Sequence, residues 1–369
     1  MVFIIYGTTG ELIKITPLLV DLKKNNKCFT VALVQQEEQL KKFFEAYPQV
    51  PKPDLWLVNG YNNKDLDKFY QMPIWLIKAL FAFIKNRKTI LDSSDPIREK
   101  NIVLVHGDTI TTVAGSLIAK NLKFKLGHIE SGLRSFNLMH PFPEEIDRRI
   151  VSKLARVHFA PGDTPKKNLI DAKVKGEIIN TKVNTVFDSI EYAEKQKPIN
   201  SLSNLPKKYG VISIHRNELL VNKVVFKKTL KILAEYSKKH HMVFLQHPIT
   251  LARIESLGLS YLLKDDFTYI PKLDYFSFMK LLKGADFVVT DSGGLQEECT
   301  YLNIPCLVHR KATERMDGIE EGIVQLSYYD DSKLRKFLDS PSRFKSREYA
   351  RPKSPTKAIE KYLEDNSFI

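Results

Sequence analysis

The chain has 369 residues, of which 43% are hydrophobic and 27% charged, and its formal net charge is +14. The length suits two domains rather than one, and the composition excludes a disordered chain and a bundle of membrane helices. The lysines lie in short pairs and triplets with no long basic run, so the charge indicates a solvated surface and no nucleic-acid partner is expected. Attraction to an anionic nucleotide or to a membrane surface is the alternative.

The first half of the chain alternates apolar runs with helical patterns. Strands are predicted at residues 2–6, 29–34, 102–105, 126–129 and 157–160, and helices at 12–24, 37–44, 65–91 and 164–172. The last of these helices would be capped by Thr164, with Pro165 at its first position. This alternation predicts a parallel sheet with helices on both faces.

A polar segment, residues 194–208, separates this half from a second alternating run. Strands are predicted there at 210–214, 242–246, 287–290 and 306–308, and helices at 223–240, 275–284 and 356–365. We therefore predict an α/β protein with two Rossmann-like domains, residues 1–172 and 173–352. The C-terminal segment, about residues 353–369, is expected to return to the first domain.

The most apolar run, residues 74–84, is too short to span a bilayer and contains Lys78. A helix docked in the protein's own core is the simpler interpretation. Its aromatic-rich face and flanking cations leave open a peripheral membrane contact through residues 74–88.

Carboxylates follow two neighbouring predicted strands. Asp108 lies just past residues 102–105, and Glu130 follows residues 126–129. Parallel sheets bind their ligands at the carboxyl ends of the strands, so both acids are expected at one edge of the sheet. Glu144, with Arg148 one helical turn later, adds a third acid and a cation. Acids that lie close together raise one another's pKa, so one can hold a proton while another acts as a base, although Asp108 alone also resembles a helix cap.

Two glycine turns join a predicted strand to a helix and could bind phosphate. The first, residues 7–11 (GTTGE), is equally well explained as a tight turn. It lacks the GxGxxG pattern and the following acidic residue, so NAD is not expected. The second, residues 291–294 (DSGG), offers backbone N–H groups, a hydroxyl and a helix dipole to a diphosphate, unless Asp291 merely caps the helix.

A histidine at a strand end and the three cysteines bear on catalysis and on the cellular compartment. His215, followed by Arg216, ends another predicted strand, where a structural and a catalytic role are equally plausible. Cys28, Cys299 and Cys306 have no metal-ligand spacing, so no metal site is predicted and they indicate reduced core residues of a cytoplasmic protein.

Taken together, the motifs closely resemble the non-hydrolysing UDP-N-acetylglucosamine 2-epimerases. The matching segments, in the family's order and spacing nearly from end to end, are HGDTITT, GHIESGLR, PFPEE with Arg148, HRNE, TDSGGLQEE and TER. The resemblance implies the GT-B fold, in which two Rossmann-like domains face each other and the nucleotide sugar lies in the interdomain cleft. It also implies a homodimer and no metal or redox cofactor.

The resemblance assigns roles to individual residues. It implies that Asp108, Glu130 and Glu144 are the acid/base carboxylates, assisted by His215 and Arg148 around the phosphates and the sugar. For the nucleotide it implies the following contacts: the diphosphate with Ser292, Gly293 and Gly294, the ribose with Glu298, the uracil with Phe278, the pyrophosphate with Arg315, and a neighbouring cation, Lys14.

Two segments depart from the family pattern. The first motif usually reads GTRPE, whereas Thr9 stands here in place of the arginine, so one cation on the phosphate side is missing. Bacterial members carry a QHRE-like signature for a second, activating UDP-sugar. Here residues 35–38 read QQEE, and the glutamates would repel a diphosphate.

The expected reaction is epimerisation at C2 of a UDP-N-acetylhexosamine by elimination and re-addition of UDP. The substrate pair would be UDP-GlcNAc and UDP-ManNAc, or a related 2-acetamido sugar nucleotide, and the product would serve surface polysaccharide synthesis. Two alternatives remain: a membrane-associated GT-B glycosyltransferase with a UDP-sugar donor, and a hydrolysing 2-epimerase that releases free sugar.

Overall fold

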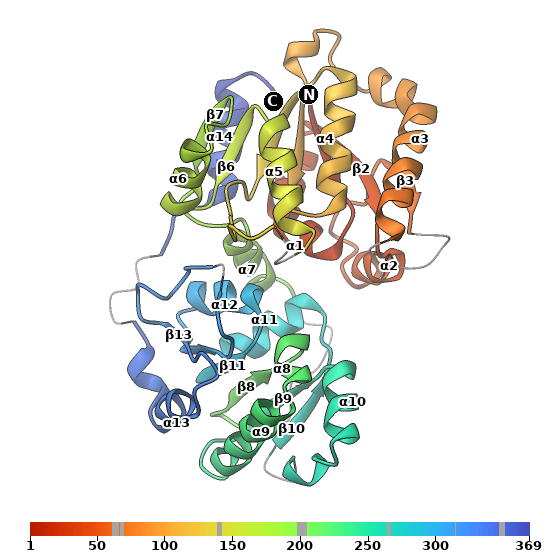
Figure 1. Cartoon of the computed structure of the whole chain (residues 1–369). Coiled ribbons are helices and arrows are strands. Elements are labelled where there is room, and N and C mark those ends of the chain that lie inside the picture. Colours follow the sequence, from red (N-terminus) through yellow and green to blue (C-terminus); the bar gives the residue numbers. More distant parts are fainter. Residues whose placement is uncertain are drawn as a thin grey trace. The chain divides into compact units, whose positions relative to one another are not determined.

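The computed structural model describes residues 1–60, 66, 70–138, 142–197, 205–263, 267–313, 315–346 and 351–369. Its contacts divide the chain into two compact units. Unit 1 comprises Met1–Ser189 and Pro352–Ile369, and unit 2 comprises Ile190–Arg351. Each unit contains one parallel sheet with helices packed against it (Figure 1). The sequence-based boundary after residue 172 falls earlier than this division, because a further strand and helix follow it within unit 1.

The sheet of unit 1 has the strand order β3-β2-β1-β4-β5-β6-β7, and every pair is parallel. Its strands are β1 (Val2–Tyr6), β2 (Cys28–Val34), β3 (Leu55–Asn59), β4 (Ile102–His106), β5 (Lys125–Ile129), β6 (Val157–Ala160) and β7 (Glu177–Asn180). Its helices are α1 (Thr9–Lys24), α2 (Glu37–Ala46), α3 (Gln71–Asp92), α4 (Ile110–Leu122), α5 (Glu144–Leu154), α6 (Asp163–Asp171) and α14 (Pro355–Asp365), with a 3-10 turn at Arg98–Lys100. Helix α7 (Val186–Glu194) begins in unit 1 and ends in unit 2.

Helices α3, α4 and α5 lie side by side, and α14 packs against α1 (Figure 1). Trp75 and Phe83 of α3 are almost fully buried in the core with Phe3 and Val103 of the sheet. The opposite face of α3 exposes large apolar side chains, so only one face of this helix is docked. In the described part of the chain, no helix is long and apolar enough to cross a membrane.

The sheet of unit 2 has the order β10-β9-β8-β11-β12-β13, again with parallel pairs only. Its strands are β8 (Gly210–Ser213), β9 (Met242–Gln246), β10 (Phe267–Pro271), β11 (Phe287–Thr290), β12 (Cys306–Val308) and β13 (Val324–Leu326). Its helices are α8 (Asn217–Val221), α9 (Lys223–Ser237), α10 (Pro248–Ser256), α11 (Tyr275–Lys283), α12 (Gly293–Tyr301) and α13 (Asp331–Asp339), with 3-10 turns at Ser260–Leu262 and Pro341–Phe344.

The strands that the sequence did not predict are β3, β7, β10 and β13, which are the outermost strands of the two sheets. Their side chains are mostly half-buried or exposed, whereas the central strands are buried almost throughout. A strand that is covered on fewer sides needs fewer apolar residues, and β7 (EIIN) and β13 (VQL) are accordingly weak in hydrophobic pattern. Strand β3 (LWLVN) was missed although its first four residues are apolar.

Several predicted helix limits differ from those of the structure, and α6 and α3 are the most informative cases. Helix α6 begins at Asp163 after Gly162, so Pro165 is its third residue and Thr164 is not its cap. Proline is tolerated at that position because N–H groups in the first helical turn have no partner within the helix. The predicted helix at 65–91 begins at Gln71 in the structure. Residues 65 and 67–69 lie outside the described residues, as do residues 198–204 of the predicted linker.

In both sheets the chain reverses the direction in which strands are added. The reversal falls between β1 and β4 in unit 1 and between β8 and β11 in unit 2. At such a switch point the loops after the two central strands diverge to opposite faces and leave room for a ligand at the carboxyl edge. The loops after β1 and β4 carry the first glycine turn and Asp108, and those after β8 and β11 carry His215 and the second glycine turn.

Candidate active site

The acids Asp108 and Glu130 follow paired strands, as predicted. Strand β4 ends at His106 and lies beside β5, whose last residue, Ile129, is the partner of His106. Asp108 lies in the loop after β4, and Glu130 follows β5 directly. The cap of the next helix, α4, is Thr109, so the alternative reading of Asp108 as the cap was wrong.

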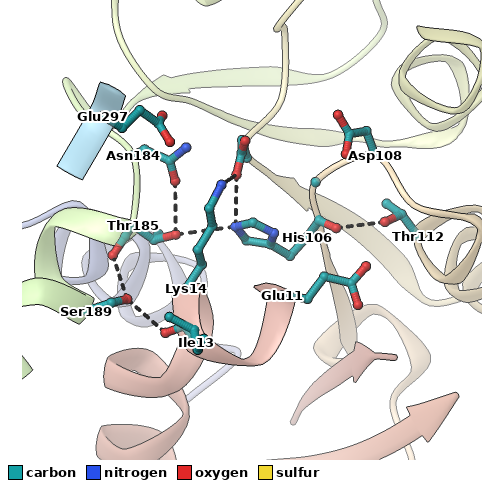
Figure 2. Close-up of polar contacts among 12 residues, drawn as sticks. Glu11, Ile13, Lys14, His106, Asp108, Thr112, Asn184, Thr185, Ser189 and Glu297 are labelled. Atoms are coloured by element: carbon teal, nitrogen blue, oxygen red, sulfur yellow. Dashed lines mark hydrogen bonds and ion pairs between the residues drawn. The ribbon is translucent and has the colours of Figure 1, made fainter. Parts of the chain in front are cut away.

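Lys14 and His106, which Figure 2 labels, point toward each other. Both lie beside the buried carboxylate of Glu130. Its Oε2 atom is 2.5 Å from Lys14 Nζ and 3.3 Å from His106 Nε2, and the Glu130 side chain is 5% exposed. The same imidazole nitrogen lies 3.4 Å from Thr185 Oγ1. Glu130 has a φ of 64°, a left-handed conformation that costs about 1–2 kcal/mol for a residue other than glycine. Strain of this kind is concentrated at functional sites, where the surrounding contacts maintain it.

Asp108 is held by Arg148, which projects from α5. The Arg148 Nε and Nη2 atoms lie 2.8 and 2.6 Å from Asp108 Oδ2. The Arg148 side chain is 7% exposed, so water screens this ion pair less than it would a surface pair. Arg148 therefore links the loop after β4 to the first turn of α5.

Further acids lie in that first turn of α5. Glu145 is fully buried, and Arg149 Nε lies 2.9 Å from its Oε1. Burial, together with the charges of Asp108 and Glu144, raises the pKa of Asp147 to about 7. Asp147 was not predicted from the sequence, because the order of polar and apolar residues in α5 does not reveal that this side chain is buried.

Of the two interpretations of the first glycine turn, the structure favours the tight turn over a free anion site. Glu11, which is buried, accepts hydrogen bonds from the backbone N–H groups of Gly7 (2.7 Å) and Thr8 (3.0 Å) and from the Thr109 hydroxyl. Thr8 and Glu11 form a reciprocal capping box at the start of α1. Burial raises the pKa of Glu11, and the hydrogen bonds oppose that rise. The chain's own carboxyl group thus occupies the position that a phosphate would need.

In unit 2, Asp291 organises the neighbouring strand end. It is fully buried, and its carboxylate accepts hydrogen bonds from the backbone N–H groups of His215 (3.0 Å) and Arg216 (2.8 Å). It does not cap helix α12, because the N-cap is Ser292. Burial and the charges of Arg216 and Lys272 lower the pKa of His215.

A second histidine, His247 at the end of β9, accompanies His215. The two rings have centroids 4.5 Å apart at an interplanar angle of 32°. Burial, together with His215, lowers the pKa of His247 to about 4, and Ser213 Oγ lies 3.3 Å from its Nε2. The sequence predicted His215 as a candidate and passed over His247, because a histidine before proline carries no signal of its own.

Helix α12 begins with Gly293 and Gly294, directly after β11 and Ser292. The Ser292 hydroxyl accepts a hydrogen bond from Leu295 N–H at 3.4 Å. Gly294 is exposed, and a Cβ added to it would meet only Ser292 Oγ, at 3.9 Å. The start of this helix can therefore approach an anion closely.

The remaining predicted nucleotide residues also lie in unit 2. Phe278 is half-buried on α11, and Glu298 is half-buried on α12. Arg315 pairs with the buried Glu297, and Gln296 fixes its chain segment through bonds to the carbonyls of Arg315 (3.0 Å) and Asp317 (2.9 Å). Glu314 of the TER motif lies outside the described residues.

The departures from the family pattern have local explanations. Gln35 is buried and donates to Thr111 Oγ1 at 2.7 Å, while Glu37 and Glu38 pair with Lys41 and Lys42 on α2, each at 2.6 Å. Thr9 is the first residue of α1. Within the described ranges, no group of His, Cys, Asp or Glu side chains is arranged to hold a metal ion.

Comparison with known proteins gives consistent results. The family model of UDP-N-acetylglucosamine 2-epimerase matches residues 81–366. The UDP-N-acetylglucosamine 2-epimerase of Methanococcus maripaludis is 33% identical over 86% of this chain and 85% of its own. The solved structure of UDP-GlcNAc 2-epimerase from Methanocaldococcus jannaschii is 28% identical, covers 99% of both chains and has a TM-score of 0.82. A second structure of that protein, in complex with UDP-GlcNAc and UDP, has a TM-score of 0.76 at the same identity and coverage. The predicted α/β fold of the GT-B class is confirmed.

Proposed function

The chain belongs to the UDP-N-acetylglucosamine 2-epimerase family, and we propose on that premise that it epimerises UDP-N-acetylglucosamine at C2 without hydrolysing it. The product is UDP-N-acetylmannosamine, and a related 2-acetamido sugar nucleotide fits the same chemistry. A cytoplasmic enzyme that serves surface polysaccharide synthesis is the role that accords with the family resemblance.

The observation that carries this proposal is the arrangement of the acids at the carboxyl edge of unit 1. Asp108 is paired with Arg148, Glu130 with Lys14, and Glu144 begins α5. Loss of the C2 proton requires a positioned base, and its return on the opposite face requires an acid. The three carboxyl groups at this edge of the sheet are the candidates for both groups.

The second requirement of the reaction is a group that stabilises the departing diphosphate. In unit 2 the start of α12 supplies backbone N–H groups and the positive end of the helix dipole, and Ser292 adds a hydroxyl. We propose that Gly293 and Gly294 bind the diphosphate there, that His215 assists, and that Phe278, Glu298 and Arg315 contact the uridine and pyrophosphate.

An NMR time course with UDP-GlcNAc in heavy water tests the proposal in one tube. The expected result is UDP-ManNAc with deuterium at C2. Release of free ManNAc would show a hydrolysing epimerase instead, and unchanged substrate at micromolar enzyme would overturn the activity altogether.

We also propose that a second copy covers the exposed face of α3 in a homodimer. Ile77, Phe81 and Ile84 on that face are 55%, 63% and 60% exposed, and their alternating spacing of four and three residues is that of helices packed side by side. Phe81→Asp should convert a dimer to a monomer in light scattering after size exclusion, and Val224→Asp, at a 67% exposed position on α9, should not. A monomeric wild type at micromolar concentration would refute the dimer.

A membrane-associated glycosyltransferase is the second candidate, and one observation favours it. The exposed cations Lys78, Lys85 and Lys88 flank the same apolar face of α3 and complement an anionic lipid surface. Sedimentation with vesicles that contain anionic lipid distinguishes a membrane contact from a dimer contact. If the wild type sediments with the vesicles and Phe81→Asp does not, the membrane contact is favoured. If the wild type stays in the supernatant, the glycosyltransferase loses its support.

A further inference from the structure

The first turn of α5 contains acids with and without partners. In this turn Glu145 is paired with Arg149, and the neighbouring Asp108, in the loop after β4, is paired with Arg148. Among the described residues, in contrast, Glu144 Oε2 and Asp147 Oδ2 are buried atoms that have no hydrogen-bond partner. Glu144 and Asp147 are three residues apart on the helix, a spacing that places their side chains on the same face.

The burial of Asp147 decides its protonation state. The residue is 4% exposed. An ionised carboxylate without a partner is costly to bury, whereas the neutral acid is not. The pKa of Asp147 is accordingly raised to about 7, first by burial and then by the negative charges of Asp108 and Glu144.

Among the described residues of the elements packed against α5, no cation is placed to reverse this effect. Helix α4 carries only Lys120, which is exposed in its last turn. On β5, Lys125 is bound by Glu177, and burial keeps His128 neutral, with its pKa lowered to about 3. Arg134, in the loop that follows β5, donates to the Leu133 carbonyl and the Ser152 hydroxyl. The arginines of α5 itself are committed to Asp108 and Glu145.

We infer that Asp147 holds a proton at neutral pH and exchanges it with Glu144. In the exchange the Asp147 O–H bond breaks, a new O–H bond forms on the Glu144 carboxylate, and the negative charge moves to Asp147. The reverse transfer restores the starting state. Asp147 is thus a positioning residue that acts through Glu144.

This inference rests on the proposed function, because the exchange matters only where Glu144 handles the C2 proton. Epimerisation removes a proton on one face of the sugar and returns one on the other, so the acid and the base end each turnover with exchanged protonation. A buried proton store beside Glu144 can reset the site without admitting bulk water.

The test compares Asp147→Asn and Asp147→Glu with the wild type. Asparagine has nearly the same shape and is neutral, but it cannot release a proton at neutral pH. We expect Asp147→Asn to lower kcat about 10- to 100-fold with KM within about twofold, and to remove the ionisation near pH 7 from the kcat profile. Asp147→Glu should recover most of the activity and the ionisation. An unchanged pH profile in Asp147→Asn would overturn the inference.

A second measurement needs no substrate. Difference infrared spectra between pH 6 and pH 8 should contain a protonated-carboxyl band in the wild type that is missing from Asp147→Asn. Glu360, whose pKa burial also raises to about 7, contributes equally to both proteins and cancels when their spectra are compared. Absence of the band from the wild type would overturn the inference whatever the activity. A wild type with the band but no epimerisation would instead refute the proposed function, and with it the exchange with Glu144, while leaving the protonated state of Asp147 established.

Discussion

At the switch point of unit 1, charged side chains bind one another: Lys14 pairs with Glu130, and Arg148 with Asp108. At the switch point of unit 2, the buried Asp291 binds backbone N–H groups, and α12 begins with two glycines. The first arrangement holds carboxylates in ion pairs, and the second leaves a helix terminus open. On the proposed function, the acids of unit 1 transfer protons and the helix terminus of unit 2 binds the diphosphate.

The two glycine turns sharpen this contrast. In unit 1 the N–H groups of Gly7 and Thr8 are taken by Glu11, whereas the first turn of α12, all of whose residues are described, contains no acidic residue. A strand, a glycine turn and a helix therefore form an anion site only where the chain does not supply its own carboxylate. The following predictions test this division, from the largest expected effect to the smallest.

Replacing an acid of unit 1 should affect the chemical step most. We expect Asp108→Asn and Glu144→Gln each to lower kcat by about 100- to 10,000-fold, because a positioned acid or base contributes about that much. The measurement is the rate of UDP-ManNAc formation by NMR. Asp163→Asn, at an 84% exposed position in the same unit, is the control and should leave the rate unchanged. A loss below about threefold would exclude Asp108 or Glu144 from the proton transfer.

Replacing one glycine of each turn by alanine should show that only the turn in unit 2 binds the nucleotide. Gly294→Ala fits the free protein, because the added carbon meets nothing closer than 3.9 Å, yet it would lie against a bound diphosphate. We expect a rise in KM, or in the dissociation constant of UDP, of about tenfold, which corresponds to about 1.4 kcal/mol. Gly10→Ala also meets nothing within 4 Å and should change neither quantity, because Glu11 occupies that turn. Equal effects at both glycines would contradict the division.

The pH dependence of stability should show the smallest effect. The pKa of Asp147 is about 7 in the folded chain, above its ordinary value of about 4, so the folded state binds the proton more tightly. The contribution of this proton to the stability of the folded state is complete below about pH 4, and it is lost as the pH rises towards 7. His128 and His247, whose pKa values are lowered to about 3 and about 4, act in the opposite direction, because the folded state loses stability as the pH falls below about 6.5.

The difference between the wild type and Asp147→Asn isolates the carboxyl group, because the histidines are common to both. We expect the melting temperature of the wild type, relative to that of the variant, to be higher at pH 5 than at pH 7.5 by a few degrees in calorimetry. A difference that does not vary with pH would contradict a protonated Asp147.

The central strands were predictable from the sequence because they are buried on both faces and form continuous apolar runs. Strands β1, β6, β9, β11 and β12 have the predicted limits. The position of Asp108, Glu130 and His215 after such strands followed directly, and the recurring motifs identified the family. The edge strand β7 (EIIN) could not be found in this way, because it has only two apolar residues, whereas β3 (LWLVN) was missed although it has an apolar run of four.

The partners of the polar side chains were decided by the tertiary structure alone. Lys14 and Glu130 are 116 residues apart in the chain, and His215 and Asp291 are 76 apart. Which cation meets which acid depends on the register of distant strands, and local periodicity contains no information about that register. The same reason explains why the sequence gave no sign that Glu11 fills the first turn or that Asp147 is buried.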